Sequence, residues 1–300
     1  MYARIMLPLD GSKLAERALG VALPLAERHG ATLCLAAVHE PVLPTAVTTG
    51  TPSYDTSLDA EQRDAMRRYL ERTAGRLRKR STLHVETAFR EGRVVPTLAA
   101  MAAEWRAQLV VLSTHGRGGF QRLWLGSVAD GLLRQTPVPA LLLRGARGAI
   151  KRPGPAAVFR RIVVALDGSS RAEAAIAAAE MLLGGDPGLL TLVHIVHPMT
   201  MAVAMRSERR PEREFAEAYL EPLAARLRAA GREVTVETRV DANVARAIGD
   251  VVEAVEADLV ALTTQGLRGV ERFMVGSVAD KLIRTATVPV LVVPGEQERM

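Results

Sequence analysis

The stretch Val110–Gly116 reads Val-Val-Leu-Ser-Thr-His-Gly, and nine residues later Gly126–Asp130 reads Gly-Ser-Val-Ala-Asp. The same arrangement recurs where Val260–Gly266 reads Val-Ala-Leu-Thr-Thr-Gln-Gly and Gly276–Asp280 again reads Gly-Ser-Val-Ala-Asp. Each copy predicts an apolar strand, a glycine-containing loop and a helix that opens at the Gly-Ser pair. Because the pattern occurs twice with one spacing, it is far more specific than a single pair of glycines.

A loop that leaves a strand and enters a helix presents backbone N–H groups that have no partner inside the helix. Together with the positive end of the helix dipole, these groups form a site for anions. Glycine at Gly126 and Gly276 lets a phosphate approach without a Cβ in its path. The hydroxyls of Ser127 and Ser277 can cap the helix or reach a phosphate oxygen. The repeated pattern therefore predicts two phosphate-binding loops.

The rest of the chain repeats around this pattern. Strand and helix signals alternate as β-α-β-α-β-α-β-α-β through residues 1–144, then restart where Arg161–Ser169 matches Arg4–Ser12. Residues 145–160 are rich in glycine, proline and basic side chains, which is typical of a linker. We expect two tandem α/β domains, at 1–144 and 161–300, each a doubly wound five-stranded parallel sheet with helices on both faces.

Composition limits the classes of function. The 300 residues carry a net charge of +6, mostly as arginines on expected helix faces, and only 4% of residues are aromatic. We interpret the arginines as a solvated surface rather than a nucleic-acid patch, which is the alternative. No apolar run reaches transmembrane length and the chain opens into a strand, so we expect no signal peptide and no membrane partner. The single cysteine, Cys34, predicts a buried thiol in a cytoplasmic protein.

Several catalytic motifs are missing from the sequence. No Gly-x-x-x-x-Gly-Lys-Ser/Thr occurs, no Gly-x-Gly-x-x-Gly follows either first strand, and no Cys/His pair has zinc-ligand spacing. No nucleophile–base pair appears in both copies. We therefore assign no catalytic residue and no metal ligand, and expect at most a slow ATPase.

With these residues in place, the chain resembles the universal stress protein family over nearly all of both halves. ATP-binding members of that family carry Gly-x-x-Gly, nine residues, then Gly-Ser or Gly-Thr. They also carry an Asp that closes the first strand and an apolar residue near the end of the second. The resemblance implies that phosphate contacts come from the loop residues Gly116, Gly126, Ser127, Val128, Gly266, Gly276, Ser277 and Val278.

The resemblance also implies a strand order of 3-2-1-4-5, which places the loops at the topological switch point where open α/β sheets bind ligands. Asp10 and Asp167 would then hold the adenosine, and Val38 and Ile195 would line the adenine slot. The chemistry agrees, because a carboxylate at a strand end can accept hydrogen bonds from ribose hydroxyls and an apolar side chain suits adenine.

This chain departs from the family pattern at its first glycine, which is Ser113 in one half and Thr263 in the other. Either side chain comes close to the ribose-phosphate path. Three alternatives follow. The chain could be an ATP-binding stress sensor or adaptor with an unknown protein partner, in which Mg²⁺ accompanies the nucleotide. It could instead be a slow metal-dependent ATPase, or an interaction module that binds no nucleotide. The first is our interpretation.

Two further expectations compare the two halves of the chain. We expect the first half to bind nucleotide more tightly than the second, because it has Pro8, Gly92 and Gly118-Gly119, and because Ser113 is smaller than Thr263. Family members commonly dimerise through the last strand, so the resemblance implies that Val138–Leu143 and Val288–Val293 pair antiparallel within the chain. A homodimer of whole chains remains open.

Overall fold

The computed structural model describes residues 1–41, 56–114, 126–144, 159–198, 212–264 and 276–294. The first half contains β1 (Arg4–Pro8), a short 3-10 turn η1 (Ala15–Ala18), α1 (Leu19–His29), β2 (Thr32–His39), α2 (Thr56–Arg78), β3 (Val85–Glu91), α3 (Val94–Glu104), β4 (Leu109–Thr114), α4 (Ser127–Gln135) and β5 (Ala140–Arg144). The second half contains β6 (Arg161–Ala165), η2 (Ser170–Glu173), α5 (Ala174–Leu183), β7 (Leu189–Val196), α7 (Glu212–Ala229), β8 (Glu233–Val240), α8 (Val244–Ala254), β9 (Leu259–Thr263), α9 (Ser277–Thr285) and β10 (Val290–Val293).

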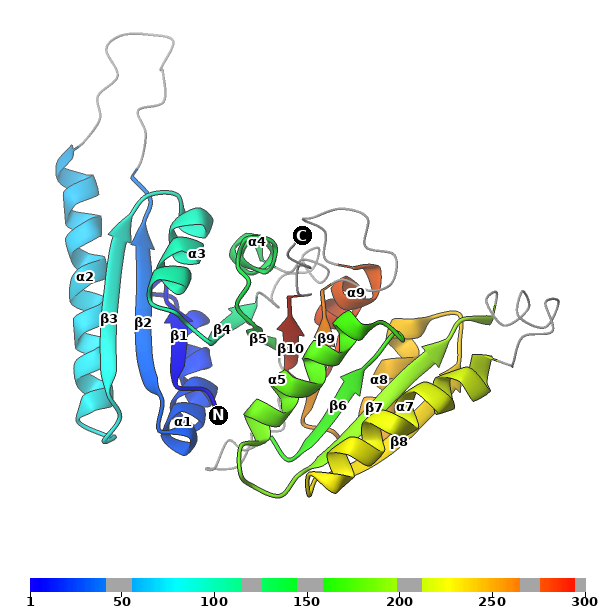
Figure 1. Ribbon diagram of the computed structural model, residues 1–300. Helices are drawn as coiled ribbons and strands as arrows, with labels where there is room; N and C mark the ends of the chain where they lie inside the picture. The colour runs from blue at the N-terminus through cyan, green and yellow to red at the C-terminus, as the bar shows by residue number, and fades with distance from the viewer. Residues whose placement is uncertain (42–55, 115–125, 145–158, 199–211, 265–275, 295–300) are drawn as a thin grey trace, which may run out of the picture.

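All these strands form one ten-stranded sheet in the order β3-β2-β1-β4-β5-β10-β9-β6-β7-β8 (Figure 1). Within each half the neighbours are parallel and follow the predicted 3-2-1-4-5 order. The predicted doubly wound α/β fold is confirmed. The domain boundaries and the linker at 145–160 stay predictions.

The two halves join through their last strands, as expected. β5 and β10 pair antiparallel, with Leu141 opposite Leu291 and Ala140 opposite Val292. These residues are completely buried, because helices cover both faces of the sheet at this point. An apolar edge strand that would otherwise invite association is thus paired within the chain.

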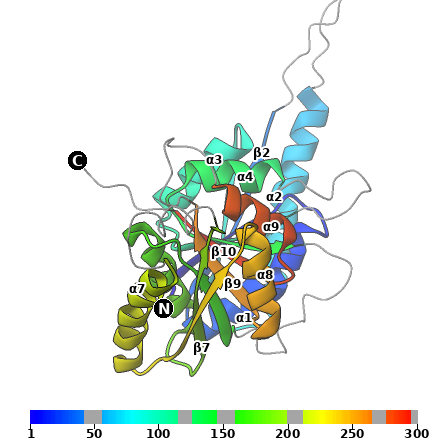
Figure 2. The ribbon, with the colours of Figure 1, turned by 90° about the vertical axis from the view of Figure 1, so that its right-hand side faces the viewer.

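Helices cover the sheet in two layers (Figures 1 and 2). One layer consists of α1, α2, α5 and α7, whose buried side chains include Leu25, Leu70, Leu182 and Leu220. The other consists of α3, α4, α8 and α9, with Met101, Leu132, Val251 and Leu282. Each layer joins apolar residues of both halves into one core cluster. Cys34 lies in the sheet and is buried as predicted, which raises the pKa of its thiol to about 12.

The helix starts differ in part from expectation. Ser12 does accept the Ala15 N–H at 3.0 Å, but the first turn there is 3-10 rather than α-helical. The sequence Ser170-Arg-Ala-Glu173 has the spacing of a capping box, but Ser169 is the cap and accepts from Ala172. None of the helices in the described ranges combines the length and the apolar character that crossing a bilayer requires.

Candidate functional site

The predicted adenosine residues follow paired strands in both halves. β1 and β2 are parallel, with Pro8 opposite Ala36 as the last pair, and Asp10 lies two residues beyond the end of β1 while Val38 is in β2. In the second half, Ala165 at the end of β6 pairs with Val193 of β7, and the predicted residues again lie two positions further along the chain. These are Asp167 and Ile195.

The face of the sheet at Val38 and Ile195 is covered by α3, α4, α8 and α9. Val38 packs against the core cluster of this layer and is half-buried, whereas Ile195 belongs to the cluster itself and is 8% exposed. The carboxyl edge of this face also receives the start of α4 and α9, because β4 and β9 lead into the glycine loops. Val38, Ile195, Val128 and Val278 all pack in or against this one core cluster.

Both aspartates organise the turn that follows their strand. Oδ1 of Asp10 accepts the Ser12 N–H at 2.9 Å, and its side chain is exposed. Oδ1 of Asp167 accepts both the N–H of Ser169 at 3.0 Å and its hydroxyl at 2.6 Å. Asp167 is only half-buried, but its carboxylate carries more internal hydrogen bonds than that of Asp10. The intervening Gly11 and Gly168 have φ of 80° and 90°, which favours glycine in this turn.

A buried threonine that sequence reasoning missed lies at the carboxyl end of β4 and directly after β9. Thr114 and Thr264 are 5% and 7% exposed. The Thr114 hydroxyl donates to the Leu143 carbonyl at 3.5 Å. The signal was present, because both copies read Thr before the variable His or Gln, but we assigned it no role.

Ser113 and Thr263, the departures from the family pattern, alternate with these threonines along the strand. Val111, two residues before Ser113, packs into the core cluster under α1 and α2, whereas Leu112 packs under α3 and α4. By strand alternation Ser113 belongs to the face of the sheet that α1 and α2 cover. The roles of Ser113 and Thr263 in nucleotide binding stay predictions.

The glycine that begins each phosphate helix differs between the halves. Gly126 is the N-cap of α4 with φ of 41° and ψ of 132°. Gly276 is the N-cap of α9 with φ of −58°, and its N–H donates to the Thr264 carbonyl at 2.7 Å. Among the described residues, the structure shows no acceptor for the amides of Gly126 and Ser127. Within the described residues, one predicted phosphate donor of the second half is thus already used internally, whereas the first half shows no such bond.

The expectation that Ser127 and Ser277 cap their helices is wrong. Each is the first helical residue, the cap is the preceding glycine, and neither helix start has a side-chain cap hydrogen bond. Both serines have the hydroxyl on the surface, since Ser127 and Ser277 are exposed. A glycine cap leaves the first N–H groups of the helix without a side-chain acceptor, which suits an external anion.

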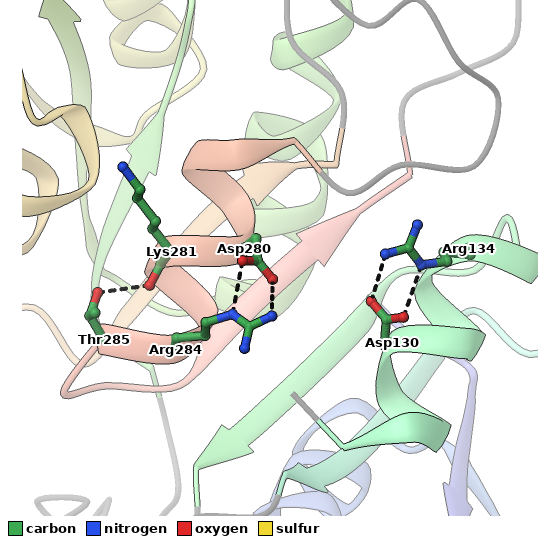
Figure 3. Close-up of polar contacts among 6 residues, drawn as sticks. All are labelled: Asp130, Arg134, Asp280, Lys281, Arg284 and Thr285. Carbon is green, nitrogen blue, oxygen red and sulfur yellow. Dashed lines mark hydrogen bonds and ion pairs between the residues drawn. The ribbon is translucent and has the colours of Figure 1, made fainter. Parts of the chain in front are cut away.

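Each phosphate helix carries an ion pair directly behind its first turn (Figure 3). Arg134 donates to both oxygens of Asp130 at 2.9 and 3.0 Å, and Arg284 donates to both oxygens of Asp280 at 2.8 and 2.7 Å. The partner carboxylate raises the pKa of each arginine, and the aspartate of the other half adds to the effect. The arginines offset a negative charge that would otherwise weaken anion binding at the helix start. Figure 3 also shows Thr285 donating to the Lys281 carbonyl at 2.8 Å.

Two predicted ligands, Gly116 and Gly266, lie outside the described residues. Val128 and Val278 are half-buried and pack against the core under their helices. No cluster of three or more His, Cys, Asp or Glu side chains that could hold a metal ion occurs among the residues that the structure describes.

The fold is that of an α/β protein with two similar halves, each with a helix that begins at a glycine cap. The sequence profile of the Universal stress protein family matches residues 1–144 and 159–294. The chain belongs to the universal stress protein family.

Its relatives match one half at a time. A Thermus aquaticus protein named "Universal stress protein in QAH/OAS sulfhydrylase 3'region" is 31% identical over 148 residues, which are 48% of this chain and 100% of that protein. A protein of Staphylococcus aureus strain USA300 that bears the family name is 32% identical over 146 residues, 46% of this chain and 86% of that protein.

A solved structure matches both halves together. A universal stress protein from Archaeoglobus fulgidus superposes with a TM-score of 0.71 over 99% of this chain and 97% of that chain, at 19% identity. At this identity the similarity shows the shared fold.

Proposed function

We propose that this chain is a cytoplasmic stress-response sensor or adaptor that binds an adenine nucleotide, ATP in the first instance, at the carboxyl edge of its sheet. Mg²⁺ would accompany the nucleotide. The single observation that supports the proposal is the glycine cap of α4, which has no side-chain cap hydrogen bond, in a sheet whose parallel strands β1 and β2 run toward Asp10 and Val38. These are the chemical groups that phosphate, ribose and adenine require.

The proposed contacts follow the chemistry of the nucleotide. The amides that begin α4 and the Ser127 hydroxyl would bind phosphate oxygens. Asp10 uses Oδ1 to hold the Ser12 amide, which leaves Oδ2 to accept a ribose hydroxyl. Val38 is half-buried, so it offers an apolar surface to the adenine ring without a rearrangement of the core.

We propose that ATP acts as a conformational ligand rather than as a substrate for fast turnover. A ligand shifts the populations of two conformations only through its different affinity for them. The glycine loops are the segments that a bound phosphate would contact, and they connect the sheet to α4 and α9. The protein partner that would detect such a change is not identified by the sequence.

The second half supports an alternative role as an interaction module without nucleotide. There the Gly276 N–H already donates to the Thr264 carbonyl, and a Cβ built on Gly276 would lie 3.0 Å from that oxygen. The loop ends are therefore drawn tightly together. Binding of phosphate to this amide would first require that internal hydrogen bond to break, which costs roughly 0.5–1.5 kcal/mol.

Mass spectrometry of the protein purified without added nucleotide tests the proposal directly. We expect a co-purified adenine nucleotide or, after its removal, ATP binding in a calorimetric titration. Absence of both would contradict nucleotide binding and favour the interaction module. Release of phosphate at a steady rate in the presence of Mg²⁺ would favour the slow ATPase.

A further inference from the structure

At the amino edge of the sheet, opposite the candidate site, the two halves meet a second time. Here α1 and the amino-terminal segment of the first half contact the end of α5 and the turn after it. The Tyr2 hydroxyl donates to the Ala178 carbonyl at 3.2 Å, and Arg28 donates to the Leu183 carbonyl at 2.5 Å. Arg28 also forms an ion pair with Asp186 at 2.6 Å. This contact joins segments more than 150 positions apart, independently of the β5–β10 pairing.

His29, the last residue of α1, lies at the centre of this contact. Its side chain is 7% exposed, and its ring centroid is 5.9 Å from that of Tyr2. Nδ1 accepts the Tyr2 backbone N–H at 3.1 Å, so the proton of the neutral imidazole is on Nε2. Nε2 is buried and forms no hydrogen bond of normal geometry, although the Leu182 carbonyl is close enough to the ring to favour its protonated form. A Cβ built on Gly184 of the second half would lie 3.8 Å from Cε1 of this ring.

We propose that His29 is a pH-sensitive latch between the two halves, closed when its imidazole is neutral and released when it is protonated. A second proton can enter only at Nδ1, which would then face the Tyr2 N–H as one donor against another. The resulting cation would be buried next to the guanidinium of Arg28. Opening of the α1–α5 contact removes both costs, whereas the buried β5–β10 pairing keeps the halves joined.

The charged groups around the ring act in both directions. Burial lowers the pKa of His29 most, and Arg28 from α1 and the amino group of Met1 lower it further. The Leu182 carbonyl of α5 and Asp186 from the following turn act to raise it. The pKa of the Tyr2 phenol is itself raised by burial, so this group stays neutral. The net effect on His29 is a lowered pKa.

The sign of the pH dependence follows from this lowered pKa. A group that is harder to protonate in the closed form contributes its full stability above the ordinary histidine pKa of about 6.5. That contribution decreases as the pH falls below about 6.5, and the loss is complete below the pKa of the closed form. The latch is therefore closed at neutral pH and releases in acid.

The latch occurs on one side of the pseudo-symmetric molecule. In the alignment of Arg4–Ser12 with Arg161–Ser169, the counterpart of Tyr2 is Phe159. α5 ends at Leu183 before Gly184, as α1 ends at His29 before Gly30, and both glycines have φ of 61°. Phe159 thus stands where the first half has Tyr2, and the apolar Leu183 ends α5 where His29 ends α1.

Hydrogen exchange and NMR test the latch on the full chain. We expect the His29 imidazole to titrate below the ordinary histidine pKa of about 6.5. Between pH 7.5 and 5.0, protection factors in segments 1–4, 19–30 and 178–186 should fall, by at most about tenfold per pH unit because one proton is involved. Protection in β7 and β8 should not change.

Two variants separate the latch from a general effect of acid. His29→Gln retains an acceptor for the Tyr2 N–H but cannot titrate, and His29→Leu reproduces the second half. In either folded variant the pH-dependent loss of protection should disappear, whereas His84→Gln should keep it. A His29 pKa at or above the ordinary value of about 6.5, or an unchanged acid response in His29→Gln, would overturn the proposal. NMR titration of the wild-type protein alone measures the His29 pKa, so this test does not depend on whether the variants fold.

Discussion

The two halves share a strand order and an identical Gly-Ser-Val-Ala-Asp segment, yet they present different anion sites. In the first, Gly126 has positive φ and its amide has no acceptor among the described residues. In the second, Gly276 has negative φ and its amide is bonded to Thr264. An identical motif therefore does not fix the backbone of its first glycine. The different residues between strand and helix allow two conformations of the same cap.

The aspartate and the apolar residue of the candidate site are also more exposed in the first half than in the second. Asp10 is exposed and accepts one internal N–H, whereas Asp167 is half-buried and accepts two groups of Ser169. Val38 is half-buried and Ile195 is in the core. Each component is more available in the first half. These contacts support our expectation of unequal sites on grounds independent of the glycine content of the loops, since Gly118-Gly119 lies outside the described residues.

The largest effect should come from Gly126→Val. A branched side chain would occupy the phosphate position, and φ of 41° is unfavourable for valine. We expect nucleotide affinity at the tighter site to fall more than about 100-fold, or about 2.7 kcal/mol. Calorimetric titration with ATP measures it. The matched change Gly276→Val should leave the tighter site unchanged, and wild-type affinity in Gly126→Val would refute the assignment.

A smaller effect is expected from Gly92→Ala, which tests a difference in the turn after the third strand of each half. Gly92 has φ of 139°, and an added Cβ would lie 2.8 Å from Oγ1 of Thr97. We expect a loss of about 2 kcal/mol in the free energy of unfolding, measured by urea denaturation. The second half has Ala242 at the equivalent position without positive φ, so Ala242→Gly should cost less than about 1 kcal/mol. Equal losses would show that the turns are equivalent.

Asp10→Ala and Asp167→Ala compare the two sites directly. If the first half is the tighter site, Asp10→Ala should reduce its affinity for ATP by about tenfold, since one hydrogen bond to a charged group contributes roughly 1.5 kcal/mol. Asp167→Ala should leave the tight phase of the titration in place. A greater loss from Asp167→Ala would reverse the ranking of the sites.

The sequence was sufficient for the fold because hydrophobic pattern and repetition determine it. The hydrophobic patterns predict a strand over Leu189–Val196 and a helix over Ser127–Gln135, and the structure has both with these bounds. The resemblance supplied the strand order and the pairing of the last strands. Parallel strands in the predicted order end at the same edge of the sheet. The predicted aspartates, apolar residues and loop glycines all follow or end such strands, so their common edge is expected from the strand order.

The local hydrogen bonds of the site were beyond sequence reasoning. The glycine rather than the serine caps α4 and α9, because the first helical residue is fixed by the path of the preceding loop. The side on which Ser113 lies follows from strand alternation that extends to Thr114, one residue further than expected. The contact at His29 joins residues whose proximity depends on how two helices of different halves pack. No local pattern contains that information.

The smallest effect concerns the ion pairs behind the two phosphate helices. Asp130 and Arg134 are 38% and 36% exposed, against 35% and 27% for Asp280 and Arg284. Exposed i,i+4 pairs contribute about 0.3–0.5 kcal/mol, so double-mutant cycles with Asp→Asn and Arg→Met should give coupling energies in this range. The second pair should be the stronger, because it is more shielded from water. A cycle between Arg134 and Asp280 should give a smaller, nonzero coupling that vanishes near 1 M salt, where the screening length is about 3 Å. A first-half coupling larger than that of the second would show that exposure does not set their strength.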